Sequence, residues 1–574
     1  MSDAIKTRIQ AKLSLLYGAE QVETLFPQVM QLIDSFPVQR TPSPEGTPDL
    51  NLTEKDAILI TYGDMVHSGG EAPLKTLHDF LKATIHEQVN TVHLLPFYPY
   101  SSDDGFSVID YYAVNPEVGT WDDVRTMRQD FNLMFDLVLN HISAESGWFR
   151  AYLRGEAPYD GYFIDFAPDE IPHEQLKLVR RPRALPLITP FQTSRGERHV
   201  WTTFSADQID LNVENPAVLL ELLKIMLFYV ENGANLLRLD AITYLWKTLG
   251  TESVHLPQTH TVAQLMRDVL DYAAPHVVII TETNVPHLEN ISYFGSGSNE
   301  AQMVYNFSLP PLLLHTYRTG DATILTNWAA TLERVGERTT FFNFTASHDG
   351  IGVTPARGIL PDADIDALVQ LAEAHGGFVS YKNNSDGTRS PYELNATYFD
   401  AITHPDITAR DPETAIARFL GAQSIMLAMM GVPGIYFHSL FGSRNWREGV
   451  EQTGRYRTIN RQKFEVDVLR KELSQAEGLR RHVLARYLAL LRVRGAQLAF
   501  HPLAAQTVLN LHPGVVAIQR GEGRNCVLAL TNVREDAAEV TLPDGRWRDL
   551  LGGELVLSGK VTLMPYQVAW LKRL

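Results

Sequence analysis

The chain has 574 residues, of which 45% are hydrophobic and 20% charged, and its formal net charge at pH 7 is −17. This composition is typical of a globular protein and excludes a disordered or fibrous one. The acidic balance argues against nucleic acid or an anionic membrane as the main partner, so an anionic ligand needs a local cluster of basic side chains. Cys526 is the single cysteine, which excludes an internal disulfide and a cysteine-based zinc site.

Two hydropathy features bear on location. Residues 1–20 lack the long apolar core of a signal peptide, and the longest apolar stretch, 425–437, is broken by glycine and proline and is too short to span a bilayer. We therefore expect a cytoplasmic protein that acts on small-molecule substrates without nucleic acid or membrane, as a monomer or a homodimer.

Residues 1–55 predict an N-terminal helical extension, because apolar residues recur at helical spacing and a proline-rich connector follows. After it, short β-rich runs alternate with amphipathic ones. The predicted strands are 57–61, 91–95, 133–139, 235–239, 277–281, 304–307, 339–342 and 434–437. They are apolar on both faces, which is typical of a parallel sheet covered by helices. About eight βα units predict an α/β fold, a (β/α)₈ TIM barrel. A doubly wound sheet is the alternative, but no glycine-rich dinucleotide loop follows the first strand.

The barrel is expected to cover residues 56–142 and 213–498. Between these parts, residues 143–212 are irregular, aromatic and then basic, which predicts an inserted lid domain after the third strand. A long helical stretch, 465–494, closes the barrel region, and short alternating strands with Gly/Asp turns predict a β-sandwich over 499–574. In that domain Trp547, Tyr566 and Trp570 have β-spacing, which favours a core role over a starch-binding platform.

Polar residues follow the predicted strands where barrel enzymes carry their active sites. A single strand-end aspartate more often caps a helix, and a single histidine is more often a satisfied core residue. Acidic and basic side chains recur at several predicted strand ends, which favours a single active site that they form together. The residues concerned are Asp103, Asp136, His141, Arg238, Asp240, Glu282, His348 and Asp349.

The environments of these acids suggest separate roles. Asp136, in mid-strand, is predicted to be a structural partner of Arg238 or His141. Arg238 lies two residues before Asp240 and points to the same strand face, so we expect it to lower the pKa of Asp240, as suits a nucleophile. Glu282 has no cationic neighbour in sequence, and its apolar setting favours the raised pKa of an acid/base. One ionised and one protonated carboxyl group are the tools of a retaining glycosidase-type reaction.

Segments 135–141, 237–241, 279–284 and 344–349 resemble the four sequence regions of the α-amylase family, glycoside hydrolase family 13. The resemblance implies that Asp240 is the nucleophile, Glu282 the general acid/base and Asp349 the transition-state stabiliser. It places Arg238, His141 and His348 around a glucosyl ring.

Finer features look like the sucrose phosphorylase branch of that family. Segments 93–97 and 103–106 resemble its glucose-pocket segment, which implies that Asp103 holds sugar hydroxyls and Phe106 packs on the ring. Arg457 matches a sugar-binding arginine and Tyr244 a phosphate-contacting tyrosine. The chain is longer than typical sucrose phosphorylases, and segments 181–186, 284–287 and 386–393 instead resemble the glucosylglycerate phosphorylases.

This resemblance implies a retaining phosphorylase that transfers glucose between glycerate and phosphate, with phosphate as co-substrate and no other cofactor. No metal is expected, although Asn140 occupies a position that some relatives use for calcium. Guanidinium and ammonium groups suit the two anionic acceptors. Basic residues of the two segments expected to overhang the rim are the acceptor candidates, with solvated loop charges as the alternative: Arg180, Arg181, Arg183, Lys382 and Arg389. Glycines around residues 353–395 predict a loop that alternates between an acceptor-binding and a phosphate-binding pose.

Other activities remain open. The acceptor could be sucrose, sucrose 6-phosphate or glucosylglycerol, or the enzyme could be an α-glucosidase or transglucosidase. A non-catalytic carbohydrate-binding or partner-binding barrel is a further alternative, but the combination of Asp240, Glu282 and Asp349 argues against it.

Overall fold

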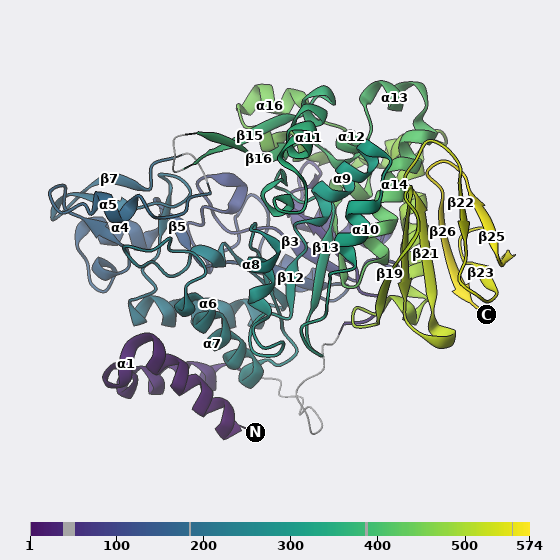
Figure 1. Cartoon of the computed structure of the whole chain (residues 1–574). Helices are drawn as coiled ribbons and strands as arrows, with labels where there is room; N and C mark the ends of the chain where they lie inside the picture. The colour runs from purple at the N-terminus through teal and green to yellow at the C-terminus, as the bar shows by residue number, and fades with distance from the viewer. Residues whose placement is uncertain (1, 38–51, 183–184, 385–387, 554) are drawn as a thin grey trace.

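The computed structural model describes residues 2–37, 52–182, 185–384, 388–553 and 555–574 (Figure 1). Eight parallel strands close into a barrel in the spatial order β1-β17-β13-β12-β11-β10-β4-β3. In chain order they are β1 (Ile58–Thr61), β3 (Thr91–Leu94), β4 (Asn132–Val138), β10 (Ala234–Asp240), β11 (Val278–Thr281), β12 (Met303–Tyr305), β13 (Thr340–Phe344) and β17 (Val432–Tyr436). The predicted (β/α)₈ barrel is confirmed, and the doubly wound sheet is excluded by the closure of β1 on β17.

Strand register brings the polar strand ends together. Arg238 of β10 lies opposite Asp136 of β4, and Leu239 lies opposite Thr281 of β11. All barrel strands run parallel, so their carboxyl ends meet at one rim. Asp240 and Glu282 thus leave neighbouring strands at the same level.

Amphipathic helices flank the barrel strands, including α2 (Pro73–Thr84), α6 (Pro216–Glu231), α7 (Pro257–Ala273), α9 (Leu309–Thr319) and α14 (Pro412–Ala428). Helix α2 shows the pattern: Leu74, Leu77 and Leu81 are buried at helical spacing. The N-terminal helix α1 (Ser2–Ser35) packs against α7 and α6 and is kinked at Gly18, whose φ is 80° (Figure 1). Within the described residues no helix combines the length and apolar character needed to cross a membrane.

Between β4 and β10 the chain forms an inserted unit of short strands and helices. Strands β5 (His141–Ser143) and β9 (Gln208–Asp210) pair, and β8 (Gly196–Trp201) pairs with β6 (Asp165–Phe166) and β7 (Ile188–Thr193). Helices α4 (Gly147–Arg154) and α5 (His173–Leu176) belong to the same unit, which extends to one side of the barrel in Figure 1. Val179, Leu187 and Trp201 form its own small apolar cluster.

The segment after β13 differs from the predicted loop. It contains β14 (Ile351–Gly352), helix α11 (Asp362–Ala374) and the antiparallel strands β15 (Phe378–Asn383) and β16 (Arg389–Asn395). The predicted loop over 353–395 is therefore wrong as a description of secondary structure. One of the glycines in this segment lies at the end of a helix. Gly376 has a φ of 83° just after α11, a left-handed conformation that glycine adopts without strain.

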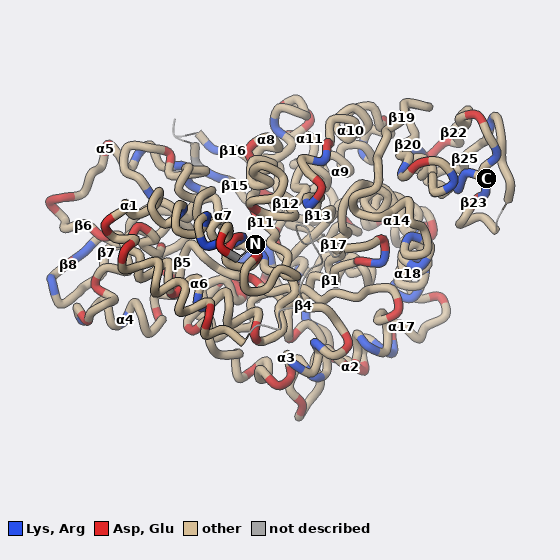
Figure 2. Tube along the Cα trace, turned by 90° about the horizontal axis from the view of Figure 1, so that it is seen from below, with Lys and Arg blue, Asp and Glu red and all other residues tan. Residues whose placement is uncertain are grey.

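At the C-terminal side the predicted helical stretch divides into α17 (Val466–Ser474) and α18 (Leu479–Gly495). A six-stranded antiparallel sheet and a two-stranded sheet follow, and the first of them packs on α14 (Figure 1). The strands are β19 (Gln506–His512), β20 (Val515–Arg520), β21 (Val527–Asn532), β22 (Ala538–Thr541), β23 (Trp547–Asp549), β24 (Val556–Leu557), β25 (Lys560–Leu563) and β26 (Val568–Arg573). Trp547, Tyr566 and Trp570 are buried, which confirms their predicted core role. Figure 2 shows acidic and basic residues interspersed along the trace.

Candidate active site

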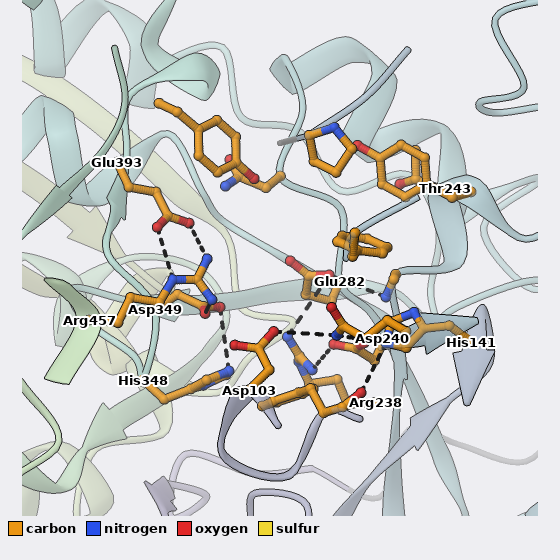
Figure 3. Close-up of a pocket in the computed structure, with 18 of the residues that line it drawn as sticks. Asp103, His141, Arg238, Asp240, Thr243, Glu282, His348, Asp349, Glu393 and Arg457 are labelled. Atoms are coloured by element: carbon orange, nitrogen blue, oxygen red, sulfur yellow. Dashed lines mark hydrogen bonds and ion pairs between the residues drawn. The ribbon is translucent and has the colours of Figure 1, made fainter. Parts of the chain in front are cut away.

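A cavity lies at the carboxyl ends of the barrel strands (Figure 3). Its walls come from four parts of the chain: barrel strand ends, the unit between β4 and β10, hairpin β15–β16 and the 3-10 helix η6 (Tyr456–Asn460). It brings together all ten of the predicted catalytic and substrate-binding residues. These are Asp103, Phe106, His141, Arg238, Asp240, Tyr244, Glu282, His348, Asp349 and Arg457.

Arg238 of β10 pairs with two buried acids, Asp240 of the same strand and Asp136 of β4. Its Nη1 lies 2.5 Å from Oδ1 of Asp240 and 2.5 Å from Oδ1 of Asp136. Asp136 also accepts a hydrogen bond from Nε2 of His93 at 2.7 Å and is fully buried. The predicted structural role of Asp136 beside Arg238 is confirmed, whereas the structure records no hydrogen bond or ion pair between Asp136 and His141, both of which are described.

The predicted lowering of the Asp240 pKa is wrong in its net direction. Burial raises the pKa of Asp240 most, Arg238 lowers it as expected, and the neighbouring carboxylates of Glu282 and Asp136 raise it again, to about 8. The pKa of Glu282 is also raised, as predicted, chiefly by burial. Because the pKa of each group is raised, the two adjacent buried carboxyl groups compete for a proton.

Geometry decides which of the two acids carries the negative charge. Arg238 contacts Asp240 at 2.5 Å, whereas its Nη2 is 3.9 Å from Oε2 of Glu282. The guanidinium therefore stabilises the ionised form of Asp240 more strongly, and the proton stays on Glu282. One charged and one protonated carboxyl group face the same cavity, which is the arrangement that nucleophilic attack with acid assistance requires.

Asp349 is held ionised by a different arginine. Nη1 of Arg457 lies 2.6 Å from Oδ1 of Asp349, and Nε2 of His348 lies 3.4 Å from its other oxygen. Burial alone raises the pKa of Asp349, but Arg457 and the neighbouring cations hold it well below its usual range. Burial lowers the pKa of His348 to about 3, so its ring is neutral and available for hydrogen bonds.

Two stacked aromatic rings line the cavity, and one of them, Phe106, follows a strained turn. Phe106 and His348 stack with centroids 4.7 Å apart at 6°. Phe106 follows Asp103 and Asp104, which both have positive φ, and Gly105, where a Cβ would lie 2.5 Å from the carbonyl oxygen of Pro96. Such a left-handed turn is costly for aspartates and is typical of a site whose geometry is constrained by function.

His141 and Tyr244 complete the predicted lining. Nε2 of His141 donates to the carbonyl oxygen of Phe106 at 3.0 Å, and burial lowers the pKa of His141 to about 4, so it is neutral. Tyr244, in the 3-10 helix η3 (Ile242–Tyr244), lies edge-on to Phe204 with ring centroids 5.4 Å apart.

The predicted acceptor cations lie farther out. Arg181 is exposed and donates to the carbonyl oxygen of Leu185 at 3.2 Å, while Lys382 and Arg389 stand on hairpin β15–β16. None of these three is among the residues that line the cavity, although Pro182, next to Arg181, is. Arg183 lies outside the described residues.

Arg180, at the start of the same segment, is ion-paired. Its Nη2 lies 2.7 Å from Glu252 and its Nη1 lies 2.9 Å from Glu289. These contacts attach the segment that carries Pro182 to the loop before α7 and to helix α8 (His287–Ile291).

Asn140 contacts the ammonium group of a buried lysine. Its Oδ1 accepts a hydrogen bond from Nζ of Lys247 at 2.7 Å, and the same ammonium lies 3.0 Å from Oδ2 of Asp210. All three side chains are buried. Among the described residues no cluster of histidine, cysteine and acidic side chains suits a metal ion.

The cavity also contains residues that the sequence did not single out. Tyr392 and Glu393 enter from β16, Phe204 and Gln208 from the segment before β10, and Asn284 from the loop after β11. Glu393 is the most informative, because its carboxylate contacts Arg457 at 2.6 Å. In the sequence, Glu393 could have been found from its position in segment 386–393, which carries part of the family resemblance.

Comparison with known proteins agrees with this geometry. The α-amylase catalytic domain model matches residues 79–351. A glucosylglycerate phosphorylase from Allomeiothermus silvanus is 49% identical over 571 residues, which cover 100% of this chain and 99% of that protein. A second, from Spirochaeta thermophila, is 48% identical and covers 98% of this chain and 95% of its own length. The chain belongs to the glucosylglycerate phosphorylase branch of the α-amylase family. Among solved structures, sucrose 6F-phosphate phosphorylase from Thermoanaerobacter thermosaccharolyticum matches with a TM-score of 0.72 and 25% identity, over 84% of this chain and 94% of that one.

Proposed function

We propose that the protein is a retaining glucosyl phosphorylase that reversibly converts 2-O-α-D-glucosyl-D-glycerate and phosphate into α-D-glucose 1-phosphate and D-glycerate. The observation that carries the proposal is the placement of Asp240 and Glu282 around Arg238, at 2.5 Å and 3.9 Å, in one cavity. Near-full-length identity of 48–49% to two glucosylglycerate phosphorylases supports the choice of acceptor.

In the first half-reaction, the ionised carboxylate of Asp240 attacks the anomeric carbon of the glucoside. The bond from that carbon to the glycerate oxygen breaks, and Glu282 gives its proton to that oxygen. Asp349 and the Phe106–His348 pair face the sugar ring, where the carboxylate stabilises positive charge that develops in the transition state.

In the second half-reaction, Glu282 removes a proton from phosphate, and a phosphate oxygen attacks the same carbon from the side that glycerate has left. The bond to Asp240 breaks and the carboxylate is regenerated. Two inversions retain the α configuration. Water must be kept from the same intermediate, because its attack gives free glucose.

We further propose roles for the outer parts of the chain. Residues 143–212 act as a lid whose Pro182 and Phe204 line the acceptor side of the cavity, and 499–574 form a β-sandwich that supports α14. Arg181, Lys382 and Arg389 are the proposed contacts for the glycerate carboxylate or for phosphate, reached when lid and hairpin close over substrate. Guanidinium and ammonium groups fit both anions.

The enzyme is proposed to work without a resident metal or organic cofactor. The Lys247 ammonium already supplies positive charge to the oxygens of Asn140 and Asp210. None of the bond changes above needs a Lewis acid, since Glu282 supplies the proton and Arg238 the charge stabilisation.

The anomeric configuration of the product tests the double displacement. Glucosylglycerate and phosphate are incubated with the enzyme, and the anomeric configuration of the glucose 1-phosphate, which as a phosphate ester does not mutarotate, is determined by NMR. The proposal predicts the α anomer alone, together with a glucosyl adduct on Asp240 when a fluorinated glucosyl fluoride is used as a trap. A β product, or an adduct on another residue, would show a different mechanism.

A further inference from the structure

Glu393 is a buried carboxylate that the chemistry above leaves without a role. It lies on β16, its side chain is 3% exposed, and it lines the cavity (Figure 3). Its two oxygens accept from Arg457: Oε2 from Nε at 3.0 Å and Oε1 from Nη2 at 2.6 Å. The third nitrogen of Arg457, Nη1, lies 2.6 Å from Oδ1 of Asp349. The guanidinium of Arg457 thus bridges the carboxylates of Glu393 and Asp349, and all three residues line the cavity.

This arrangement fixes which face of the guanidinium meets Asp349. A free arginine pairs with a carboxylate through two parallel N–H donors and occupies both of its oxygens. Glu393 takes the Nε–Nη2 edge of Arg457, so Asp349 meets another side of the guanidinium, where its recorded contact runs from Nη1 to Oδ1. The second oxygen of Asp349 lies 3.4 Å from Nε2 of His348, and both residues line the cavity.

The backbone around Glu393 is well suited to hold it. β16 is the central strand of a three-stranded sheet, and Glu393 pairs with Gly352 of β14 and with Ser380 of β15. Gly350 allows the close approach, because a Cβ there would lie 2.8 Å from the Cβ of Glu393. The neighbouring residue Tyr392 lines the same cavity, so β16 joins the acceptor side to Asp349 through Arg457.

We propose that Glu393 is a positioning residue of the reaction: it orients Arg457 so that one oxygen of Asp349 stays available to the glucosyl ring, and it links that carboxylate to hairpin β15–β16. This inference rests on the proposed function for the reaction that it serves. Glu393 itself does not touch the reacting atoms.

The charge of Glu393 also reaches Glu282 through Arg457. Arg457 is one of the groups that lower the pKa of Glu282, and a neutral residue at 393 leaves its positive charge less compensated. Other ionisable groups that face Glu282 stay unchanged in such a variant: Arg238, Asp240, Asp349 and Tyr244. Loss of the Glu393 charge therefore moves the basic limb of the pH–rate profile to lower pH, since Glu282 must be protonated to act.

The test compares Glu393→Gln, Glu393→Asp and Asp400→Asn with the unmodified enzyme. Asp400 is a matched control: it is also 3% exposed and paired with one arginine, Arg444, but it lies outside the cavity. The measurements are kcat and KM for phosphorolysis of glucosylglycerate, the pH profile, thermal unfolding, and hydrolysis of α-glucosyl fluoride, which needs no glycerate or phosphate.

Glu393→Gln is expected to lower kcat about 10- to 100-fold on both substrates, since small misplacements of catalytic groups cost rates of this order. The basic limb of the pH–rate profile of Glu393→Gln is expected to lie at lower pH than that of the unmodified enzyme. In Glu393→Asp, which keeps the charge, the limb is expected to return toward the pH found for the unmodified enzyme. Asp400→Asn lowers thermal stability without moving kcat or the limb. An unmodified kcat and pH profile in Glu393→Gln, with only a loss of stability, would overturn the inference.

The fluoride assay separates this inference from the proposed function. If the unmodified enzyme hydrolyses the fluoride but does not phosphorolyse glucosylglycerate, the proposed acceptor is wrong. The effect of Glu393→Gln on fluoride hydrolysis then still decides the role of Glu393. If Glu393→Gln does not fold, the same comparison is made with Glu393→Asp, for which a lower kcat with an unshifted limb is the expected result.

Discussion

The proposed reacting groups, which define the glucose side, lie on barrel strand ends, whereas the predicted acceptor cations, which define the acceptor side, lie on the segment between β4 and β10 and on hairpin β15–β16. Arg238 and Asp240 are buried and joined at 2.5 Å, while Arg181 and Arg389 are exposed. Under the proposed function, the groups that make and break bonds lie on barrel strand ends, and the groups proposed to choose the acceptor lie on the segments between strands.

The largest expected effect is on the glucose side. Asp240→Asn removes the nucleophile and is predicted to lower phosphorolysis by on the order of 10⁴-fold, with the cavity otherwise intact. Steady-state rates with glucosylglycerate measure this, and thermal unfolding serves as the folding control. Loss of less than about tenfold would mean that another group forms the bond to glucose.

Removal of the acid has a smaller and more selective effect. Glu282→Gln is predicted to lower glucosylglycerate phosphorolysis about 10³-fold, because the glycerate oxygen leaves without a proton. Glucosyl transfer from α-glucosyl fluoride to the enzyme is affected far less, since fluoride needs no protonation. Equal losses on both substrates would contradict the assignment of Glu282 as the acid.

The pH profile tests the same pair of carboxyl groups. Because the pKa of Glu282 is raised and the acid must be protonated, phosphorolysis is predicted to fall as pH rises through that pKa. Asp240→Asn removes a neighbouring negative charge that shares a proton with Glu282, so residual activity in this variant should lose its basic limb at a lower pH. A basic limb at the same pH in both proteins would show that the two groups are not coupled.

Much of the glucose side could be predicted from the sequence because its signal is local. A strand end, Arg238 two residues before Asp240, and the order of four segments along the chain are all visible without coordinates. The partner of Arg457 was not visible, because Glu393 is 64 residues away and approaches it only through the packing of β16 on η6. The net pKa of Asp240 was mispredicted for a similar reason: burial and a second carboxyl group are properties of the folded cavity.

A moderate effect on stability is expected from the buried ion pair between Lys247 and Asp210. Lys247→Met leaves the buried carboxylate of Asp210 without its cation, so the free energy of unfolding should fall by about 3 kcal/mol. Denaturant unfolding measures it, and Lys224→Met, which changes an exposed lysine, is the control. A chelator should change neither stability nor activity; inactivation by the chelator would reveal a metal that the proposal excludes.

The smallest expected effects lie on the acceptor side. Lys382→Ala and Arg181→Ala are each predicted to raise the KM for glycerate about fivefold, which corresponds to the roughly 1 kcal/mol of a partly exposed ionic contact. Hydrolysis of α-glucosyl fluoride should not change. Unaltered KM values for both glycerate and phosphate would show that these side chains are ordinary solvated charges.

The most direct test of the whole account is phosphate release from α-glucose 1-phosphate with separate acceptors: D-glycerate, glycerol, fructose, fructose 6-phosphate and none. The account predicts strong release with D-glycerate and little with the others. Strong release with fructose or glycerol instead would keep Asp240 and Glu282 in their roles and change the acceptor. Fast release without any acceptor would contradict the account, because water would then take the glucosyl group and the enzyme would be a hydrolase.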